Sequence, residues 1–180
     1  MKKSKNKIKN KILEFLEKNK IKFNLLEHKK VFTAFDEAET LASSPKTRGT
    51  QGKKLSEIAK AVLIKVDKSL ALVVVPAGKY VDFSGVKKAL KAKKVSMAKE
   101  SDINQKLKTK IGLLHPFGNL YHPSGDHPKG DKIPTLLDNT LAKSKKLIAA
   151  AASYTQSVEL STKDFEKLVN PLKGKFSKKK

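Results

Sequence analysis

The sequence contains no cysteine, and this absence excludes disulfide bonds, cysteine-ligated metal sites and thiol catalysis. It also has no apolar run near the roughly 18 residues that a membrane-spanning helix requires. The N-terminus is basic but lacks the apolar segment of a signal peptide, so we expect a cytoplasmic protein without a membrane partner. The 180 residues suffice for one domain with a substantial core, and they contain no internal repeat.

Acidic residues are scarce relative to lysine, and the formal net charge is +23. Residues 1–12 carry six lysines and residues 173–180 carry five, with no acid in either segment. Without these eleven charges the body still has a net charge of +12, so we expect the domain itself to attract polyanions. Arg48 is the only arginine, and lysine acts as a point charge rather than as a bidentate reader of guanine. The composition therefore favours binding to phosphates over readout of base edges; the alternative is a lysine-rich surface that only confers solubility.

The hydrophobic pattern predicts one mixed α/β (α+β) domain at residues 9–170, between basic tails at 1–8 and 171–180. We expect the second tail to be disordered. Thr33 is the expected N-cap of a helix because acidic residues follow in its first turn. The expected helices cover residues 7–19, 33–41, 82–91, 101–107 and 161–169. The expected strands cover residues 23–28, 61–66, 70–76, 95–98, 146–151 and 157–160, with a further apolar segment at 133–138.

A loop at residues 110–118 concentrates glycine and proline among apolar side chains. Gly112 and Gly118 permit the close approach of a ligand or of another backbone, and Pro116 fixes its own φ and restricts His115. Such a loop can present N–H groups to a ligand at fixed angles, although a tight turn between two elements explains the same residues.

The order of these segments resembles that of the YbaK and prolyl-tRNA synthetase editing-domain family, the aminoacyl-tRNA deacylases. The resemblance spans roughly residues 9–170 and rests on the Gly112-x-x-x-Pro116 loop with Phe117-Gly118 after it, and on Lys60 near the start of a hairpin strand. It implies a single domain with a curved mixed β-sheet surrounded by short helices. It also implies a freestanding deacylase that hydrolyses the ester of mischarged tRNA in trans, without a cofactor. The implied partners are the aminoacylated 3′ end of tRNA and an aminoacyl-tRNA synthetase.

The resemblance also assigns roles to individual residues. The Lys60 ammonium would grip a phosphate or polarise the ester carbonyl, and Lys65, on the opposite face of the strand, is the competing candidate. N–H groups from Leu113 to His115 would donate to the carbonyl oxygen or to a water molecule. The expected catalytic residues are Lys60, Gly112, His115 and Pro116. The expected substrate-binding residues are His28, Thr33, Leu113, Leu114, Phe117, Gly118 and Asp138.

Three histidines have alternative interpretations. His115 stands where relatives often carry a small residue, and it either acts on water as a general base or is an ordinary loop histidine. His122 and His127 have a spacing compatible with zinc ligation. No partner pair at ligand spacing accompanies them, so we expect a surface loop without a metal.

Two other functions fit the same sequence. Many relatives have Lys-Thr where this chain has Lys60-Ala61, so the domain is alternatively a catalytically silent module that binds tRNA or other RNA. The third hypothesis is a ribosome-associated or nucleoid protein that binds only through its lysine tails.

Overall fold

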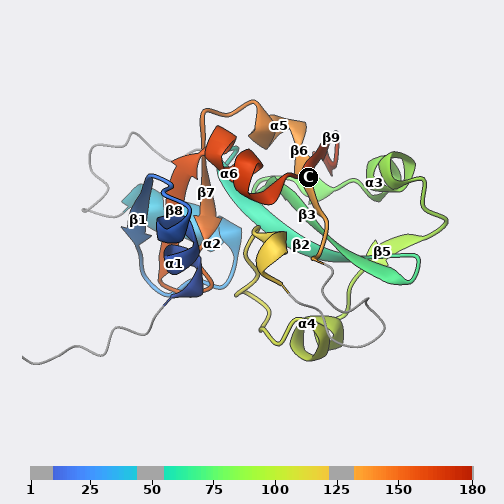
Figure 1. Cartoon of the computed structure of the whole chain (residues 1–180), viewed down its shortest axis with the longest axis horizontal. Helices are drawn as coiled ribbons and strands as arrows, with labels where there is room; N and C mark the ends of the chain where they lie inside the picture. Colours follow the sequence, from blue (N-terminus) through green and yellow to red (C-terminus); the bar gives the residue numbers. More distant parts are fainter. Residues whose placement is uncertain (1–9, 44–54, 122–131, 180) are drawn as a thin grey trace, which may run out of the picture.

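The computed structural model describes residues 10–43, 55–121 and 132–179 (Figure 1). The predicted polar loops at 43–54 and 119–132 fall largely outside this part of the chain, as do His122 and His127. The helices are α1 (Lys11–Lys18), α2 (Ala34–Ser43), α3 (Phe83–Leu90), α4 (Glu100–Lys106), α5 (Asn139–Ala142) and α6 (Thr162–Val169), with a 3₁₀ turn at Gly118–Leu120. The strands are β1 (Phe23–Glu27), β2 (Ile58–Val66), β3 (Ser69–Pro76), β4 (Tyr80–Val81), β5 (Val95–Met97), β6 (Thr135–Asp138), β7 (Lys146–Ala150), β8 (Gln156–Ser161), β9 (Leu172–Gly174) and β10 (Ser177–Lys178).

Eight strands form one mixed sheet in the order β1-β8-β7-β2-β3-β6-β9, and β5 also pairs with β2. The β2–β7, β3–β6 and β6–β9 pairs are parallel, and the other pairs of this sheet are antiparallel. The strands β4 and β10 form a separate two-stranded sheet. Helices surround the large sheet, with α1 and α2 beside its β7–β8 half and α3 and α4 beside the other half (Figure 1). The predicted mixed α/β domain is confirmed.

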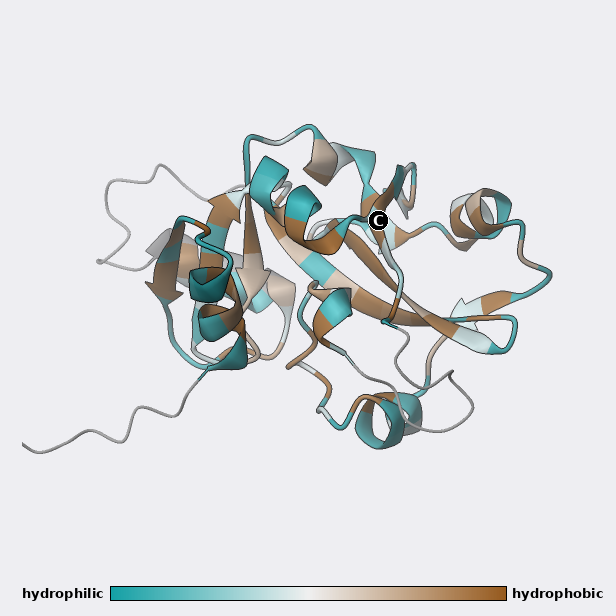
Figure 2. Ribbon diagram, in the orientation of Figure 1, coloured by the Kyte–Doolittle hydropathy of each residue, from teal (hydrophilic) through white to brown (hydrophobic). Residues whose placement is uncertain are grey.

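The β2–β3 hairpin lies at the centre of the sheet, and its strands have nine and eight residues. Runs of valine, leucine, isoleucine and alanine favour strands that are buried on both faces. Figure 2 shows hydrophobic residues concentrated in these two strands, with hydrophilic residues on the helices around them. Asp67 adopts a φ of 52° in the connecting turn, and its carboxylate accepts hydrogen bonds from the N–H groups of Lys93 (3.1 Å) and Lys94 (2.8 Å). The predicted hairpin is therefore confirmed, and its turn is fixed to the strand β5 that follows.

Side chains of β2 alternate between two hydrophobic clusters, because successive residues of a strand point to opposite faces. Leu63 packs with Ile103 of α4 and with Tyr121. Its neighbour Ile64 packs with α3 and with Phe176 on the other face. Packing on both faces fixes the orientation of every side chain of β2, including that of its two lysines.

The N-terminal helix α1 is amphipathic, as its sequence spacing predicts. Ile12 and Leu16 are fully buried against the sheet, and burial of two such side chains stabilises the fold by roughly 3–6 kcal/mol. Asn10 caps the helix, since its side-chain oxygen accepts a hydrogen bond from the Ile12 N–H at 3.0 Å. The predicted start at residue 7 lies outside the described residues.

The prediction that residues from Pro171 onward form a disordered tail is wrong. Strand β9 pairs with β6, and β10 pairs with β4. Phe176 lies between these strands with only 1% of its surface exposed, and its N–H donates to the Asp138 carboxylate at 2.9 Å. Lysines on both sides of Phe176 gave the segment the composition of a tail, but one buried aromatic ring and two strand pairings are enough to order it.

The sequence pattern also missed several short elements. Strand β4 has two residues and helix α5 has four, which is too short for a hydrophobic period to develop. Every helix in the described part of the chain is too short or too polar to cross a lipid bilayer.

Candidate active site

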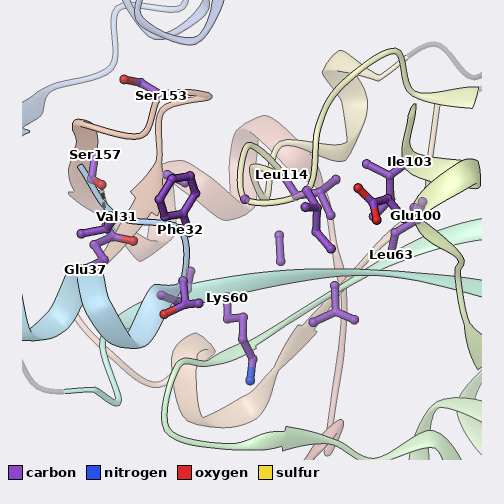
Figure 3. Close-up of a pocket in the computed structure, with 18 of the residues that line it drawn as sticks. Val31, Phe32, Glu37, Lys60, Leu63, Glu100, Ile103, Leu114, Ser153 and Ser157 are labelled. Atoms are coloured by element: carbon purple, nitrogen blue, oxygen red, sulfur yellow. Dashed lines mark hydrogen bonds between the residues drawn. The ribbon is translucent and has the colours of Figure 1, made fainter. Parts of the chain in front are cut away.

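A cavity of about 390 Å³ lies between β2, α4, the start of α2 and the loop that contains Gly112 (Figure 3). Leu63, Ile103 and Leu114 form an apolar wall, and Glu37 and Ser157 lie on the opposite side (Figure 3). The lining comes from five stretches of chain, within residues 28–37, 59–63, 97–103, 111–114 and 150–157. The hairpin strand and the glycine-proline loop, which the sequence analysis singled out separately, therefore face one cavity.

The floor of the cavity is a stretch of β2 that lies between two pairing partners. On this edge, β7 pairs with residues 58–59 of β2 and β5 pairs with residues 64–66. The carbonyl groups of Glu57 and Leu63 point to this edge, since they accept hydrogen bonds from Ile148 and Ala98. Backbone groups alternate between the two edges of a strand, so the N–H and C=O of Ala61 point to the same edge, into the gap. The floor thus offers main-chain hydrogen-bonding groups.

The loop around Gly112 presents further N–H groups. Gly112 has a φ of 84°, a backbone conformation that favours glycine. A Cβ added at Gly112 would lie 3.2 Å from the Phe32 carbonyl oxygen and from the Tyr154 ring, so the surrounding space is also too tight for a side chain. The Leu113 N–H donates to the Lys110 carbonyl at 3.0 Å and is therefore occupied. Within the described part of the chain, no group accepts from the N–H groups of Gly112 or Leu114. Both of these residues line the cavity, so their amides are the donors that the loop can offer to a ligand.

His115 lies in the core rather than on the cavity, contrary to the prediction. Its ring stacks on Tyr121 with 4.2 Å between centroids and an angle of 7°. Burial lowers the pKa of His115 to about 3, and its Nδ1 has no hydrogen-bond partner in the described residues. Its backbone N–H donates to the Tyr121 hydroxyl at 2.8 Å, so this amide is also occupied. A neutral, buried imidazole of this kind packs the loop against Tyr121 and does not line the cavity.

The next three residues also lie away from the cavity. Phe117 is buried among aromatic rings, with centroids 6.3 Å from Phe15 and 5.6 Å from Phe165. Gly118 packs so closely against Thr135 that a Cβ would not fit. Pro116 is buried beside them. These three residues and Leu113 therefore do not line the cavity, where their predicted catalytic and binding roles would place them. We infer that they shape the loop instead.

Lys60 lines the cavity through its stem, while its ammonium points away from Phe32 and Leu114 (Figure 3). The Nζ atom donates a hydrogen bond to the Lys79 carbonyl at 2.5 Å and lies 5.8 Å from the centroid of the Tyr80 ring. The ammonium is thus held by the turn between β3 and β4, and neither Lys79 nor Tyr80 lines the cavity.

The competing candidate Lys65 has a different partner. Its Nζ lies 3.0 Å from the buried carboxylate of Asp102 on α4, and Lys106 binds the same carboxylate at 3.5 Å. Burial alone would raise the pKa of Asp102, but the hydrogen bonds and charges of its neighbours outweigh it and lower the pKa. Lys65 therefore anchors α4, and it lies on the opposite face from Lys60, as the strand period predicts.

A chain of three polar side chains lies at the other side of the cavity. The Ser157 hydroxyl donates to Oε1 of Glu37 at 2.5 Å and lies 2.9 Å from Nε2 of His28. Nδ1 of His28 lies 2.8 Å from the carbonyl oxygen of Lys29, which fixes a proton on Nδ1 because a carbonyl can only accept. Burial raises the pKa of Glu37, although the hydrogen bond from Ser157 and the charge of His28 oppose this shift.

The donor and acceptor roles of His28 depend on its tautomer, so these contacts allow two arrangements of the protons. If Ser157 donates to Glu37, then Nε2 of His28 must carry a proton to donate to the Ser157 oxygen, and His28 is charged. If His28 is neutral, Ser157 donates to Nε2 and a protonated Glu37 donates to Ser157. In either arrangement each hydrogen bond along this chain has one donor and one acceptor.

The two remaining predicted residues differ in position. Thr33 lines the cavity and caps α2, since its hydroxyl oxygen accepts from the Asp36 N–H at 3.1 Å. Asp138 lies outside the cavity and accepts from the N–H groups of Thr140 and Phe176, each at 2.9 Å. Burial would raise the pKa of Asp138, but these hydrogen bonds and that of Ser177 outweigh it and lower the pKa. Asp138 is thus a structural anchor for α5 and the C-terminal segment.

Among the described residues, no group of three histidine, aspartate or glutamate side chains lies close enough together to hold a metal ion. The histidine pair considered in the sequence analysis lies outside them.

The sequence analysis missed Glu37 and Ser157. Glu37 had been interpreted as a favourable charge at a helix N-terminus, although its spacing of four from the buried Leu41 places it on the inner face of α2. Ser157 is buried at the start of β8, and strand alternation alone does not reveal that it faces a cavity.

Comparison with known proteins completes the description of the site. The hypothetical protein APE2540 has a TM-score of 0.74 and 17% identity, over 93% of this chain and 99% of the other. A candidate trans-editing enzyme for prolyl-tRNA synthetase has a TM-score of 0.69 and 16% identity, over 93% and 94% of the two chains. These likenesses show a shared fold, and comparison with curated protein sequences finds no match. The model of the aminoacyl-tRNA editing domain matches residues 33–168, which is most of the sequence, and the chain therefore belongs to the aminoacyl-tRNA editing domain family.

Proposed function

We propose that the protein is a freestanding aminoacyl-tRNA deacylase that hydrolyses the ester of mischarged tRNA in trans. One observation carries the proposal: Lys60 of β2 and the loop residues Gly112 and Leu114 line the same cavity, and the N–H groups of Gly112 and Leu114 have no acceptor among the described residues. Family membership supports it independently. Its partner is the aminoacylated 3′ end of tRNA, with an aminoacyl-tRNA synthetase as a second partner, and the chemistry needs no cofactor.

The reaction requires little from the protein beyond positioning and polarisation. An aminoacyl ester is already activated, and the neighbouring ribose hydroxyl can assist the attack of water. The Gly112 and Leu114 N–H groups donate to the ester carbonyl oxygen, on which negative charge develops in the transition state. The Lys60 ammonium binds the same oxygen or the terminal phosphate in this proposal, and to do so it must first leave the Lys79 carbonyl that holds it away from the cavity.

The cavity also suits the amino acid. A volume of about 390 Å³ accommodates an aminoacyl group together with part of the ribose. The Glu37 carboxylate accepts a hydrogen bond from the α-ammonium group of the substrate. The wall formed by Leu63, Ile103 and Leu114 receives the amino-acid side chain.

A panel of alanyl-, cysteinyl-, seryl- and prolyl-tRNA tests this function. We expect hydrolysis of at least one of the four and a loss of about a hundredfold or more in kcat for Lys60→Ala. Lys68→Ala is the matched control, because Lys68 is an exposed lysine of the β2–β3 turn, outside the cavity. Absence of hydrolysis across the panel, or an unchanged Lys60→Ala variant, would contradict the proposal.

The second candidate is a catalytically silent tRNA-binding module. The engagement of the Lys60 ammonium by the Lys79 carbonyl and the Tyr80 ring favours it, because this position holds the charge away from the cavity. Equal affinity for charged and uncharged tRNA, a steep salt dependence and no hydrolysis would establish this alternative.

A further inference from the structure

We propose that Phe32 and Tyr154, together with Lys30, form a nucleobase-stacking site at the mouth of the cavity, which takes a base of the single-stranded 3′ end of RNA. This inference rests on the proposed function for its choice of ligand. It extends that function by naming the residues that hold the nucleotide which carries the ester.

The first observation is an exposed aromatic ring beside a cavity. Phe32 lines the cavity, yet 58% of its surface is exposed, so its ring is not part of the core. The Phe32 and Tyr154 rings contact each other, with 5.0 Å between centroids and an angle of 55°. The rings are tilted rather than stacked face to face, so a planar ligand can pack on the exposed surface of Phe32. Figure 3 shows the ring of Phe32 beside Val31, above the floor formed by β2.

The second observation is that the position of these rings is fixed by the backbone. The Val31 N–H donates to the Tyr154 carbonyl at 2.9 Å, and the His28 N–H donates to the Thr155 carbonyl at 3.0 Å. The Tyr154 hydroxyl lies 3.4 Å from the carbonyl oxygen of Ile111, next to Gly112. The rings are therefore attached to the loop whose amides we assign to the ester, and a base stacked on Phe32 lies beside the reacting group.

The third observation is a positive charge at the same place. The Lys30 Nζ lies 5.1 Å from the Phe32 ring centroid and 5.5 Å from that of Tyr154. Lys29 precedes it, and both lysines are exposed. An aromatic face combined with cations is the chemistry of single-strand RNA binding, in which bases stack on rings and phosphates contact lysines. The charge of +23 favours this occupant over an apolar peptide segment.

The test uses an uncharged acceptor-stem hairpin RNA whose terminal base is replaced by 2-aminopurine, whose fluorescence falls when it stacks. We expect the full-length protein to quench this fluorescence. Phe32→Ala and Phe32→Leu should weaken the binding that produces quenching by about tenfold, whereas Phe32→Trp should retain it, because only a flat ring stacks. Leu172→Ala is the control, since Leu172 is also an exposed hydrophobic residue but lies on β9, outside the cavity. In the deacylation assay, Phe32→Leu should raise KM by a similar factor and change kcat less.

The outcomes separate this proposal from the deacylase assignment. Quenching that depends on the Phe32 ring, without hydrolysis of any substrate, would support the stacking site and contradict the deacylase. Hydrolysis with a KM that Phe32→Leu leaves unchanged would overturn the stacking site and leave the deacylase intact. Quenching that is equal in Phe32→Leu and in the unmodified protein, or binding of an apolar peptide in place of the RNA at Phe32, would also overturn it.

Discussion

Replacement of His115 by phenylalanine should leave hydrolysis intact and remove a pH-dependent part of the stability. The phenylalanine ring keeps the stacking on Tyr121 and cannot be protonated. Since His115 lies outside the cavity, we expect kcat and KM for the best substrate to stay within about twofold at pH 7.5. A general base at this position would instead require a loss of about a hundredfold.

The magnitude follows from the pKa of the buried ring. Burial lowers the pKa of His115 from 6.5 to about 3, so the folded protein keeps the ring neutral while the unfolded chain takes up a proton below pH 6.5. The stability that the neutral ring provides is therefore complete above pH 6.5 and is lost progressively as the pH falls towards 3. Each pH unit below 6.5 removes about 1.4 kcal/mol, so a change from pH 7.5 to pH 5 removes about 2 kcal/mol.

Urea unfolding at pH 5 and pH 7.5 measures this difference. We expect the free energy of unfolding of His115→Phe to fall by about 2 kcal/mol less than that of the unmodified protein over this interval. The comparison between the two proteins cancels the other titrating groups, which they share. Equal losses of stability would refute the assignment of His115 as a buried neutral ring, and loss of hydrolysis in a stable variant would place His115 in the chemistry.

Three further variants test other parts of the structure. Gly112→Ala should lower the free energy of unfolding by about 1–2 kcal/mol in urea melts and should slow deacylation. Alanine is strained at a φ of 84°, and its Cβ would displace Phe32 or Tyr154. Gly78→Ala is the stability control, because a Cβ at Gly78 would meet no atom closer than 3.4 Å. Glu37→Gln should become more stable than the unmodified protein as the pH rises above 4.5. Burial raises the pKa of Glu37 in the folded state, so the unmodified protein loses stability when this carboxyl ionises, and glutamine does not ionise. A stability gain of Glu37→Gln that is confined to lower pH would contradict this reasoning. Asp138→Ala should lower the free energy of unfolding by about 2–4 kcal/mol and expose the C-terminal segment to proteases. The N–H groups of Thr140, at the start of α5, and of Phe176 both lose their acceptor. Unchanged resistance of the C-terminal segment to proteolysis would argue against Asp138 as its anchor.

The fold was largely predictable from the sequence because its signals are local. The apolar runs of β2 and β3 and the cap residue Thr33 each act within a few residues, and each is confirmed. Phe176 carries no such signal. Its burial depends on Asp138, 38 positions away in the chain, and no local pattern reports that contact.

The site was predictable to the level of segments but not of side chains. The spacing of Gly112 and Pro116 indicated the loop, and the structure places that loop on the same cavity as Lys60. Whether a residue of the loop points inward or outward depends on tertiary packing, and Tyr121 draws His115 into the core. Ser157 and Glu37 meet only because β8 and α2 converge, at 120 positions apart in the chain.

The gap on the edge of β2 makes part of the cavity independent of amino-acid identity. The N–H and C=O of Ala61 belong to the peptide chain itself, and threonine, serine or valine at this position would present the same two groups in the same directions. A substitution at residue 61 can therefore change the side chain on the floor of the cavity without removing these two hydrogen-bonding groups. A ligand contact made through these two groups would not depend on which side chain residue 61 carries.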